Sequence, residues 1–167
     1  MVITYCGEGC FRVQSGETAI LVDPLPRFKG GITLFTQFPP TESGVLDKVG
    51  TISPAPTASR GEAGNLPFPN AAVVGPGEYE MQGVEITGLP LKESDAKNLK
   101  TAYVATLEEI RLAFLGPISE ALDPSYLEKL GHVDLLFIPA SGKPFIDEEA
   151  AAKMIKQIDP KIVICSF

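Results

Sequence analysis

Histidine and cysteine are scarce in this chain of 167 residues, which has one histidine and three cysteines. Three thiols cannot all pair with one another, so disulfide bonds are not expected to hold the fold together. No apolar run approaches the roughly 18 residues that a membrane-spanning helix needs, and no leader-like segment precedes the strand-like residues that follow Met1. We therefore expect a cytoplasmic protein with reduced thiols and no membrane partner.

Clustered positive charge is missing as well. The chain has 14 Lys and Arg residues against 21 Asp and Glu residues, a net charge of −7. Nucleic-acid binding draws most of its affinity from a cationic face that displaces counterions. Because the basic residues are scattered, nucleic acid is not an expected partner.

The length and the composition are those of an ordinary globular domain. A chain of this length can bury roughly 70% of its unfolded surface without help from a disulfide or a metal. The hydrophobic fraction is 44% and the charged fraction 21%, which are usual values. We predict a single domain over residues 1–167, made of two comparable halves at about 1–75 and 76–167.

The first half has the pattern of a β-meander. Short apolar or alternating runs separated by glycine turns predict strands at 2–6, 10–14 and 18–22. Further strands are predicted at 32–38, 49–53 and 71–74, with a short helix at 42–48. The Pro- and Gly-rich stretch 54–69 has the composition of a loop, and residues 75–80 are also interpreted as a loop.

The second half adds helices to strands. Strands are predicted at 84–88, 101–106 and 110–115, followed by two helix-then-strand units. The first helix begins after Asp123 and ends at Gly131. The second, over 147–158, repeats apolar residues at i, i+3, i+4 and i+7. The last strands are predicted at 135–139 and 161–165, and the whole pattern favours an α/β (α+β) fold, a four-layer αββα sandwich.

Six segments occur in an order that resembles a known family: Ile3–Arg12, Ile20–Pro24, Gly75–Glu80, Gly83–Gly88, Val133–Pro139 and Pro160–Ile164. Together they resemble the small metallo-β-lactamase-fold hydrolases, in particular the ascorbate-phosphate-lactonase-like subgroup. The resemblance covers nearly the whole chain and is weakest between Arg27 and Leu66. It implies the αββα sandwich, but function belongs to the site and not to the scaffold.

The metal ligands of that family are replaced in this sequence. The family's His-x-His-x-Asp-His loop corresponds to Pro54, Pro56, Ala58 and Ser59. Its bridging aspartate, in a Leu-Gly-Asp pattern, corresponds to Pro117, and its terminal histidine falls at the end of the last strand, near Phe167. Catalytic zinc needs three or more His, Asp, Glu or Cys ligands. The resemblance therefore implies a vacated metal site and no cofactor.

Other side chains of the predicted cleft offer an alternative ligand set. Glu8, Asp23, Glu78 and Asp134 are placed by the resemblance at strand ends or loops that border the cleft, and carboxylates suit Mg, Ca or Mn better than zinc. The competing interpretation of Asp23 is an Asp-Pro turn, and that of Glu78 is a solvated loop acid.

The thiols and the histidine are each given a structural interpretation beside a functional one. Cys6, Cys10 and Cys165 can be small buried residues or thiolates, and a nucleophilic thiolate needs a neighbouring base. His132 is expected at the end of a helix or in a loop, because one imidazole cannot build the family's site.

Three functional hypotheses follow. The first is a metal-free, non-catalytic member of the fold, retained for binding or assembly through its cleft. The second is a divalent-metal-dependent hydrolase that uses carboxylate and cysteine ligands. The third is a structural subunit that pairs with a paralogue. For partners we therefore expect a homo-oligomer or a paralogous subunit, and a small-molecule ligand that the sequence does not identify.

Overall fold

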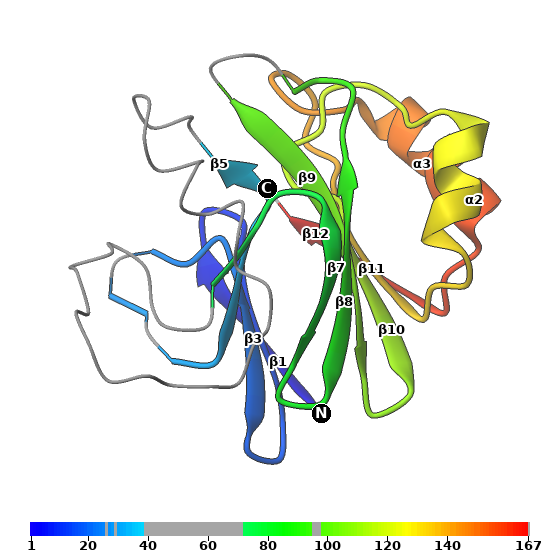
Figure 1. Ribbon diagram of the computed structural model, residues 1–167. Helices are drawn as coiled ribbons and strands as arrows, with labels where there is room; N and C mark the ends of the chain where they lie inside the picture. The colour runs from blue at the N-terminus through cyan, green and yellow to red at the C-terminus, as the bar shows by residue number, and fades with distance from the viewer. Residues whose placement is uncertain (26, 29, 39–71, 95–97, 167) are drawn as a thin grey trace.

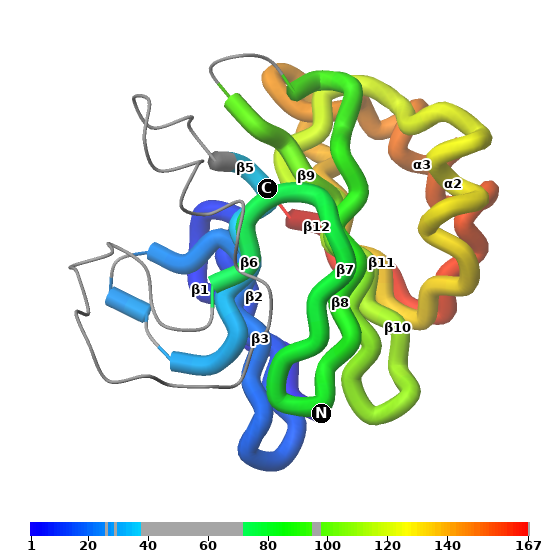
Figure 2. The backbone as a smooth tube through the Cα atoms, in the orientation of Figure 1, coloured from blue at the N-terminus to red at the C-terminus, as the bar shows by residue number. Residues whose placement is uncertain are grey.

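The computed structural model describes residues 1–25, 27–28, 30–38, 72–94 and 98–166. The predicted helix at 42–48, the strand at 49–53 and the loop at 54–69 lie outside these ranges. The described residues form two β-sheets that face each other, with helices outside the second sheet (Figures 1 and 2).

The first sheet contains five strands in the order β1-β2-β3-β4-β6. Their bounds are β1 Val2–Gly7, β2 Cys10–Ser15, β3 Thr18–Val22, β4 Ile32–Phe35 and β6 Ala72–Val74. Strands β1, β2 and β3 form the antiparallel meander that the glycine turns predict. Strands β3, β4 and β6 are parallel, so the chain leaves β3 and β4 at the same end of the sheet.

The second sheet contains seven strands, with the path β12-β11-β10-β9-β8-β7 and β5 paired to β9. Their bounds are β5 Gln37–Phe38, β7 Gly77–Met81, β8 Val84–Pro90, β9 Leu99–Leu107, β10 Ile110–Phe114, β11 Leu135–Pro139 and β12 Ile162–Ser166. Strands β7 to β10 are antiparallel neighbours, and β10, β11 and β12 are parallel.

Two helices supply the crossovers between the parallel strands of the second sheet. Helix α2 (Pro124–Leu130) connects β10 to β11, and helix α3 (Glu148–Ile158) connects β11 to β12. Both pack on the outer face of the second sheet (Figure 1). The Asp147 side chain caps α3 by accepting a hydrogen bond from the Ala150 N–H at 2.8 Å. Asp123 stands at the start of α2 but makes no such bond.

The apolar residues divide into two cores, as a layered sandwich requires. One core fills the space between the sheets and includes Phe11, Ile20, Phe114 and Phe137. The other lies between the second sheet and the helices. The predicted stripe of α3 faces this second core with Ala151, Met154 and Ile158 buried. The predicted α+β sandwich is thus confirmed.

One of the loop predictions is wrong. The sequence predicts a loop over residues 75–80, but Gly77–Met81 is strand β7, paired antiparallel with β8. Gly75, Pro76 and Gly77 indicate a turn locally, and pairing along β8 overrides that preference just beyond them. In the part of the chain that the structure describes, no helix is both long and apolar enough to cross a membrane.

Candidate functional site

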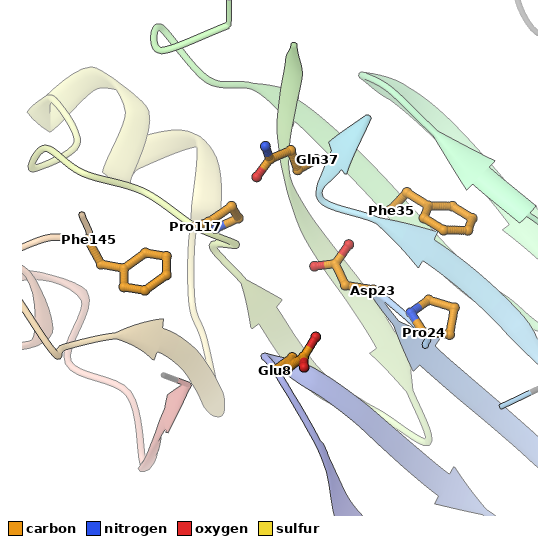
Figure 3. Close-up of a pocket in the computed structure, with 7 residues that line it drawn as sticks. All are labelled: Glu8, Asp23, Pro24, Phe35, Gln37, Pro117 and Phe145. Atoms are coloured by element: carbon orange, nitrogen blue, oxygen red, sulfur yellow. The ribbon is translucent and has the colours of Figure 1, made fainter. Parts of the chain in front are cut away.

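The candidate site is a pocket where several strands end. It has a volume of about 440 Å³, within the usual range for small-molecule pockets of about 300–1,000 Å³. Its lining comes from the β1–β2 turn, the ends of β3, β4 and β10, strand β5 and the segment after β11 (Figure 3). The lining residues are Glu8, Asp23, Pro24, Phe35, Gln37, Pro117 and Phe145.

Asp23 follows β3 and carries the most constrained carboxylate of the pocket. Its backbone has a φ of 45°, a conformation that Asp tolerates better than most residues. Its Oδ1 accepts a hydrogen bond from the Thr36 N–H at 2.8 Å, and its Oδ2 accepts one from the Thr36 hydroxyl. The Asp23 N–H donates to the Leu34 carbonyl at 2.9 Å. Both carboxylate oxygens therefore already hold a structural partner.

The same environment changes the acidity of Asp23. Burial raises its pKa from the ordinary value of 3.8 to about 6, although the hydrogen bonds from Thr36 oppose that rise. Desolvation disfavours the charged form of a carboxylate, whereas donors to the charged form favour it. Burial is the larger of the two effects here. The fold thus keeps the Asp23 carboxylate in a position where its charged form is destabilised.

Glu8 enters the pocket from the tight turn between β1 and β2. It lies between Gly7 and Gly9, and all three residues have positive φ angles. Unlike Asp23, Glu8 is exposed. Among the described lining residues, its carboxylate and that of Asp23 are the two acidic groups (Figure 3).

Burial of the two cysteines beside this turn fits their structural interpretation. Cys6 and Cys10 flank the turn and are both buried. Burial, more than any neighbouring charge, raises the pKa of Cys10 to about 11, so this thiol stays protonated at neutral pH. A protonated thiol is neither a good nucleophile nor a good metal ligand. Cys165 is exposed on β12 and does not line the pocket.

Pro117, where the resemblance places the family's bridging aspartate, reaches the pocket from the loop after β10. Gly116, which precedes it, has a φ of 67°, and a Cβ atom added there would lie 2.6 Å from the Thr36 side chain. Only glycine fits this approach. Thr36, which is fully buried, therefore contacts both the Asp23 carboxylate and the Pro117 loop.

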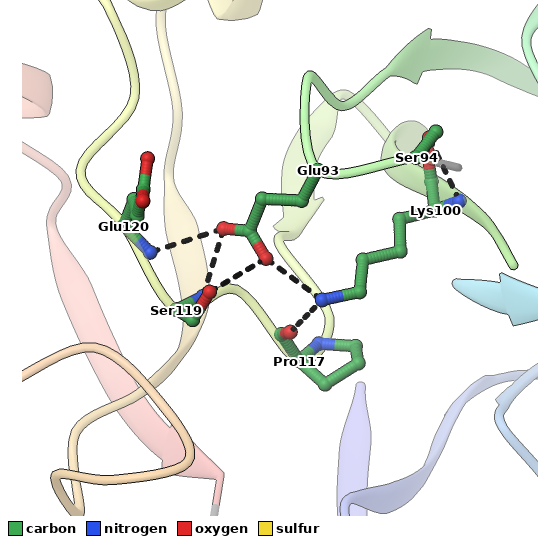
Figure 4. A network of polar contacts seen from close by, with 6 residues as sticks. All are labelled: Glu93, Ser94, Lys100, Pro117, Ser119 and Glu120. Carbon is green, nitrogen blue, oxygen red and sulfur yellow. Dashed lines mark hydrogen bonds and ion pairs between the residues drawn. The ribbon is translucent and has the colours of Figure 1, made fainter.

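A polar network holds the other side of the Pro117 loop (Figure 4). The Lys100 ammonium donates to the Pro117 carbonyl at 3.1 Å and pairs with the Glu93 carboxylate at 2.7 Å. Glu93 also accepts hydrogen bonds from the backbone of Ser119 and Glu120 and from the Ser119 hydroxyl. The hydrogen bonds to Glu93 hold its pKa below the usual value against the effect of burial.

Sequence reasoning missed Thr36, Glu93 and Lys100. The one local signal for Thr36 is a hydroxyl residue inside the apolar stretch 32–38. Glu93 and Lys100 have no recognisable signal, because their partners lie up to 27 residues away in sequence. These residues shape the pocket wall and do not line the cavity themselves.

Some of the predicted site residues do not gather in the pocket. Glu78 is on the edge strand β7, where it borders a separate surface pocket with Glu80 and Glu85. Pro54, Pro56, Ala58, Ser59 and Phe167 lie outside the described residues. The structure thus brings together Glu8, Asp23 and Pro117 from the predicted set.

The placement of Asp134 beside the cleft is wrong. Asp134 precedes β11 and so lies at the start of the parallel strands, whereas the pocket lies at their ends. There its carboxylate pairs with Lys161 at 2.6 Å and with His132 at 3.2 Å. Lys161 and the Arg111 N–H lower the pKa of Asp134 to about 2. His132 follows the residue that ends α2, as predicted for a loop histidine.

The donors that the described residues bring to the pocket do not fit the metal that the fold family implies. A catalytic zinc needs three protein ligands and an open position for water. The pocket presents the carboxylates of Glu8 and Asp23, and both oxygens of Asp23 are engaged by Thr36. Across the described ranges, no group of three or more His, Cys, Asp or Glu side chains is arranged to hold a metal ion.

Comparison with known proteins identifies the family. Residues 2–165 match the family described as "Beta-lactamase superfamily domain". The chain therefore belongs to the metallo-β-lactamase superfamily, whose members include metal-dependent hydrolases. A comparison with curated protein sequences gives no match.

Solved structures of low sequence identity share the fold. A Thermotoga maritima protein assigned as a Zn-dependent hydrolase of the metallo-β-lactamase superfamily has a TM-score of 0.71 and is 19% identical, over 98% of this chain and 74% of that chain. Igni18, a metallo hydrolase of Ignicoccus hospitalis, has a TM-score of 0.66 and is 17% identical, over 98% of this chain and 81% of that chain. CmlA, a diiron β-hydroxylase of Streptomyces venezuelae, has a TM-score of 0.60 and is 15% identical, over 98% of this chain and 44% of that chain.

Proposed function

We propose that this chain is a metal-free, non-catalytic member of the metallo-β-lactamase superfamily, in which the former metal cleft serves as a binding pocket. The observation that carries the proposal is the state of Asp23. Its two oxygens accept hydrogen bonds from Thr36, so the most buried carboxylate of the pocket supports the wall of the pocket. With Asp23 held in the wall, the described lining offers only one further carboxylate, that of Glu8, and two carboxylates fall short of the three protein ligands that a catalytic zinc needs.

The rest of the lining supports binding of a small organic molecule. Apart from Glu8, Asp23 and Gln37, the described residues around the cavity are prolines and phenylalanines. Small-molecule sites are mostly apolar with a few polar groups that fix orientation. Pro24 and Pro117 add rigid walls, because proline rings lock the backbone φ angle. A rigid, partly apolar pocket loses little entropy when a ligand enters.

A second candidate is a hydrolase with a non-standard ligand set. The observation that favours it is the presence of two carboxylates, Glu8 and Asp23, in one pocket of the right fold. Carboxylate oxygens suit Mg²⁺ or Mn²⁺. Glu8 would have to be a ligand in this case, because it is the second carboxylate of the described lining.

Metal analysis of the purified protein separates the two candidates. The protein is prepared without an affinity tag, desalted without chelator and measured by inductively coupled plasma mass spectrometry. The proposal predicts far less than one equivalent of any divalent ion. Glu8→Ala should leave the metal content unchanged, as should the control Glu78→Ala on β7, which does not border the pocket.

One equivalent of a retained ion that disappears in Glu8→Ala and persists in Glu78→Ala would support the hydrolase and refute the proposal. An ion lost from neither variant would also contradict a metal-free protein. The two variants carry the same change in charge, so an unspecific electrostatic effect would alter both equally.

A further inference from the structure

The large apolar side chains that are exposed in the described ranges are on two strands or next to them. They are Met1, Val2, Tyr5 and Ile162. Val2 and Tyr5 belong to β1, which Met1 precedes, and Ile162 belongs to β12. Scattered exposed apolar residues need no explanation, but a group of them on two strands marks a candidate contact surface.

Strands β1 and β12 lie along the same side of the sandwich. Phe11 of β2 contacts Phe137 of β11, with ring centroids 4.9 Å apart. Among the strands that the structure describes, β1 is the edge strand outside β2, and β12 is the edge strand outside β11. Ile3 and Ile164 both pack against the core between the sheets while staying partly exposed. We call this surface the β1/β12 rim and define it as Ile3, Tyr5, Ile162 and Ile164.

The rim has no charged side chain on either strand. The sequences of β1 and β12 are VITYCG and IVICS. Edge strands usually carry charges that prevent pairing with another chain. The opposite edge of the second sheet shows that protection, because β7 carries Glu78 and Glu80. The contrast within one sheet indicates that the β12 edge lacks this protection and is suited to pairing with a strand of another chain.

The backbone of β12 is also in position to pair. The Ile162 N–H donates to the Asp134 carbonyl at 2.9 Å and so faces β11. Backbone groups alternate in direction along a strand, which puts the N–H and C=O groups of Val163 and Cys165 on the outer edge. A second strand placed there would extend the seven-stranded sheet.

We propose that the β1/β12 rim is an interface between two copies of this chain, with β12 pairing antiparallel to β12 of the second copy about a two-fold axis. A two-fold interface must be complementary to itself. Two copies that each carry a net charge of −7 repel one another, and an uncharged rim is the surface where that repulsion is smallest. A basic partner would find no carboxylate on these strands to bind.

Sedimentation velocity from low-micromolar to several-hundred-micromolar protein tests this proposal. The unmodified chain should show a monomer–dimer equilibrium. Ile162→Lys and Tyr5→Lys each place a charge in the rim, and each should raise the dimer dissociation constant by about tenfold or more. Both side chains are more than half exposed, at 54% and 57%, so neither change should unfold the monomer, which thermal unfolding checks.

The matched control is Gln82→Lys. It makes the same change in charge at an exposed residue of the β7–β8 turn, next to the protected edge, and should leave the equilibrium unchanged. A chain that stays monomeric at every concentration overturns the proposal. So does a dimer that persists in both rim variants, or one that the control weakens as much as they do. None of these results depends on whether the pocket holds a metal.

Discussion

Replacing Asp23 by asparagine should change how the stability of the protein depends on pH. Burial raises the pKa of Asp23 in the folded protein to about 6, from an ordinary value of 3.8. Between these two pH values the folded state holds a proton that the unfolded state has released. Stability from this group is therefore present at low pH and is lost as the pH rises through that interval.

The size of the effect follows from the two pKa values. Each pH unit of difference corresponds to about 1.36 kcal/mol, so the interval from 3.8 to about 6 amounts to roughly 3 kcal/mol. An asparagine side chain at this position would keep an oxygen for the Thr36 N–H and tolerate the φ of 45°, but it has no proton to lose. The free energy of unfolding of the wild type, minus that of Asp23→Asn, should fall by about 2 kcal/mol between pH 4 and pH 7, since this window covers most of the interval.

Urea unfolding measured at several pH values provides the assay. The signal should be circular dichroism, because the chain has no tryptophan. Asp134 and Glu93, whose pKa values are lowered, titrate in both proteins and cancel in the difference. A difference that stays constant over this pH range, or one that grows as the pH rises, would refute the burial argument for Asp23.

Two further predictions concern the supports of the fold. Lys100→Met should lower the free energy of unfolding by about 2 kcal/mol. This loss is smaller than for a fully buried pair, because Lys100 and Glu93 both keep some solvent exposure. Denaturant titration of Lys100→Met, Glu93→Gln and the double variant tests whether the two residues act as a pair. Asp147→Ala should lower the free energy of unfolding by about 1 kcal/mol because it removes the cap of α3. Asp123→Ala should lower it by less than about 0.5 kcal/mol, because the side chain of Asp123 makes an exposed ion pair with Lys92 and no cap. Equal losses in these two alanine variants would contradict the capping argument.

Much of the fold was predictable because its signals are local. The glycine turns that separate β1, β2 and β3, and the apolar stripe of α3, are set by residues that are close in sequence. Strand β7 was missed because Gly75, Pro76 and Gly77 indicate a turn, while its pairing with β8 is a tertiary contact. The strand propensities of single residues carry no information about that pairing.

The candidate site was predictable where its residues follow strands in a recognised order. Glu8, Asp23 and Pro117 were placed in this way, and they meet in one pocket. The contacts that shape the pocket were not predictable. Thr36 bonds Asp23 across 13 residues, and Glu93 bonds Ser119 across 26 residues. Such pairs depend on how the two sheets meet, which no pattern of single residues records.

The most direct test of a metal-free pocket is a titration of the purified protein with Zn²⁺ and with Mn²⁺, read by thermal unfolding. An ion present at 100 times its dissociation constant stabilises a folded protein by about 2.7 kcal/mol, which for a domain of this length raises the Tm by roughly 5–10 °C. We expect no saturable rise for either ion. A saturable rise of that size, abolished by chelator and by Glu8→Ala, would contradict the proposal that the pocket has lost its metal.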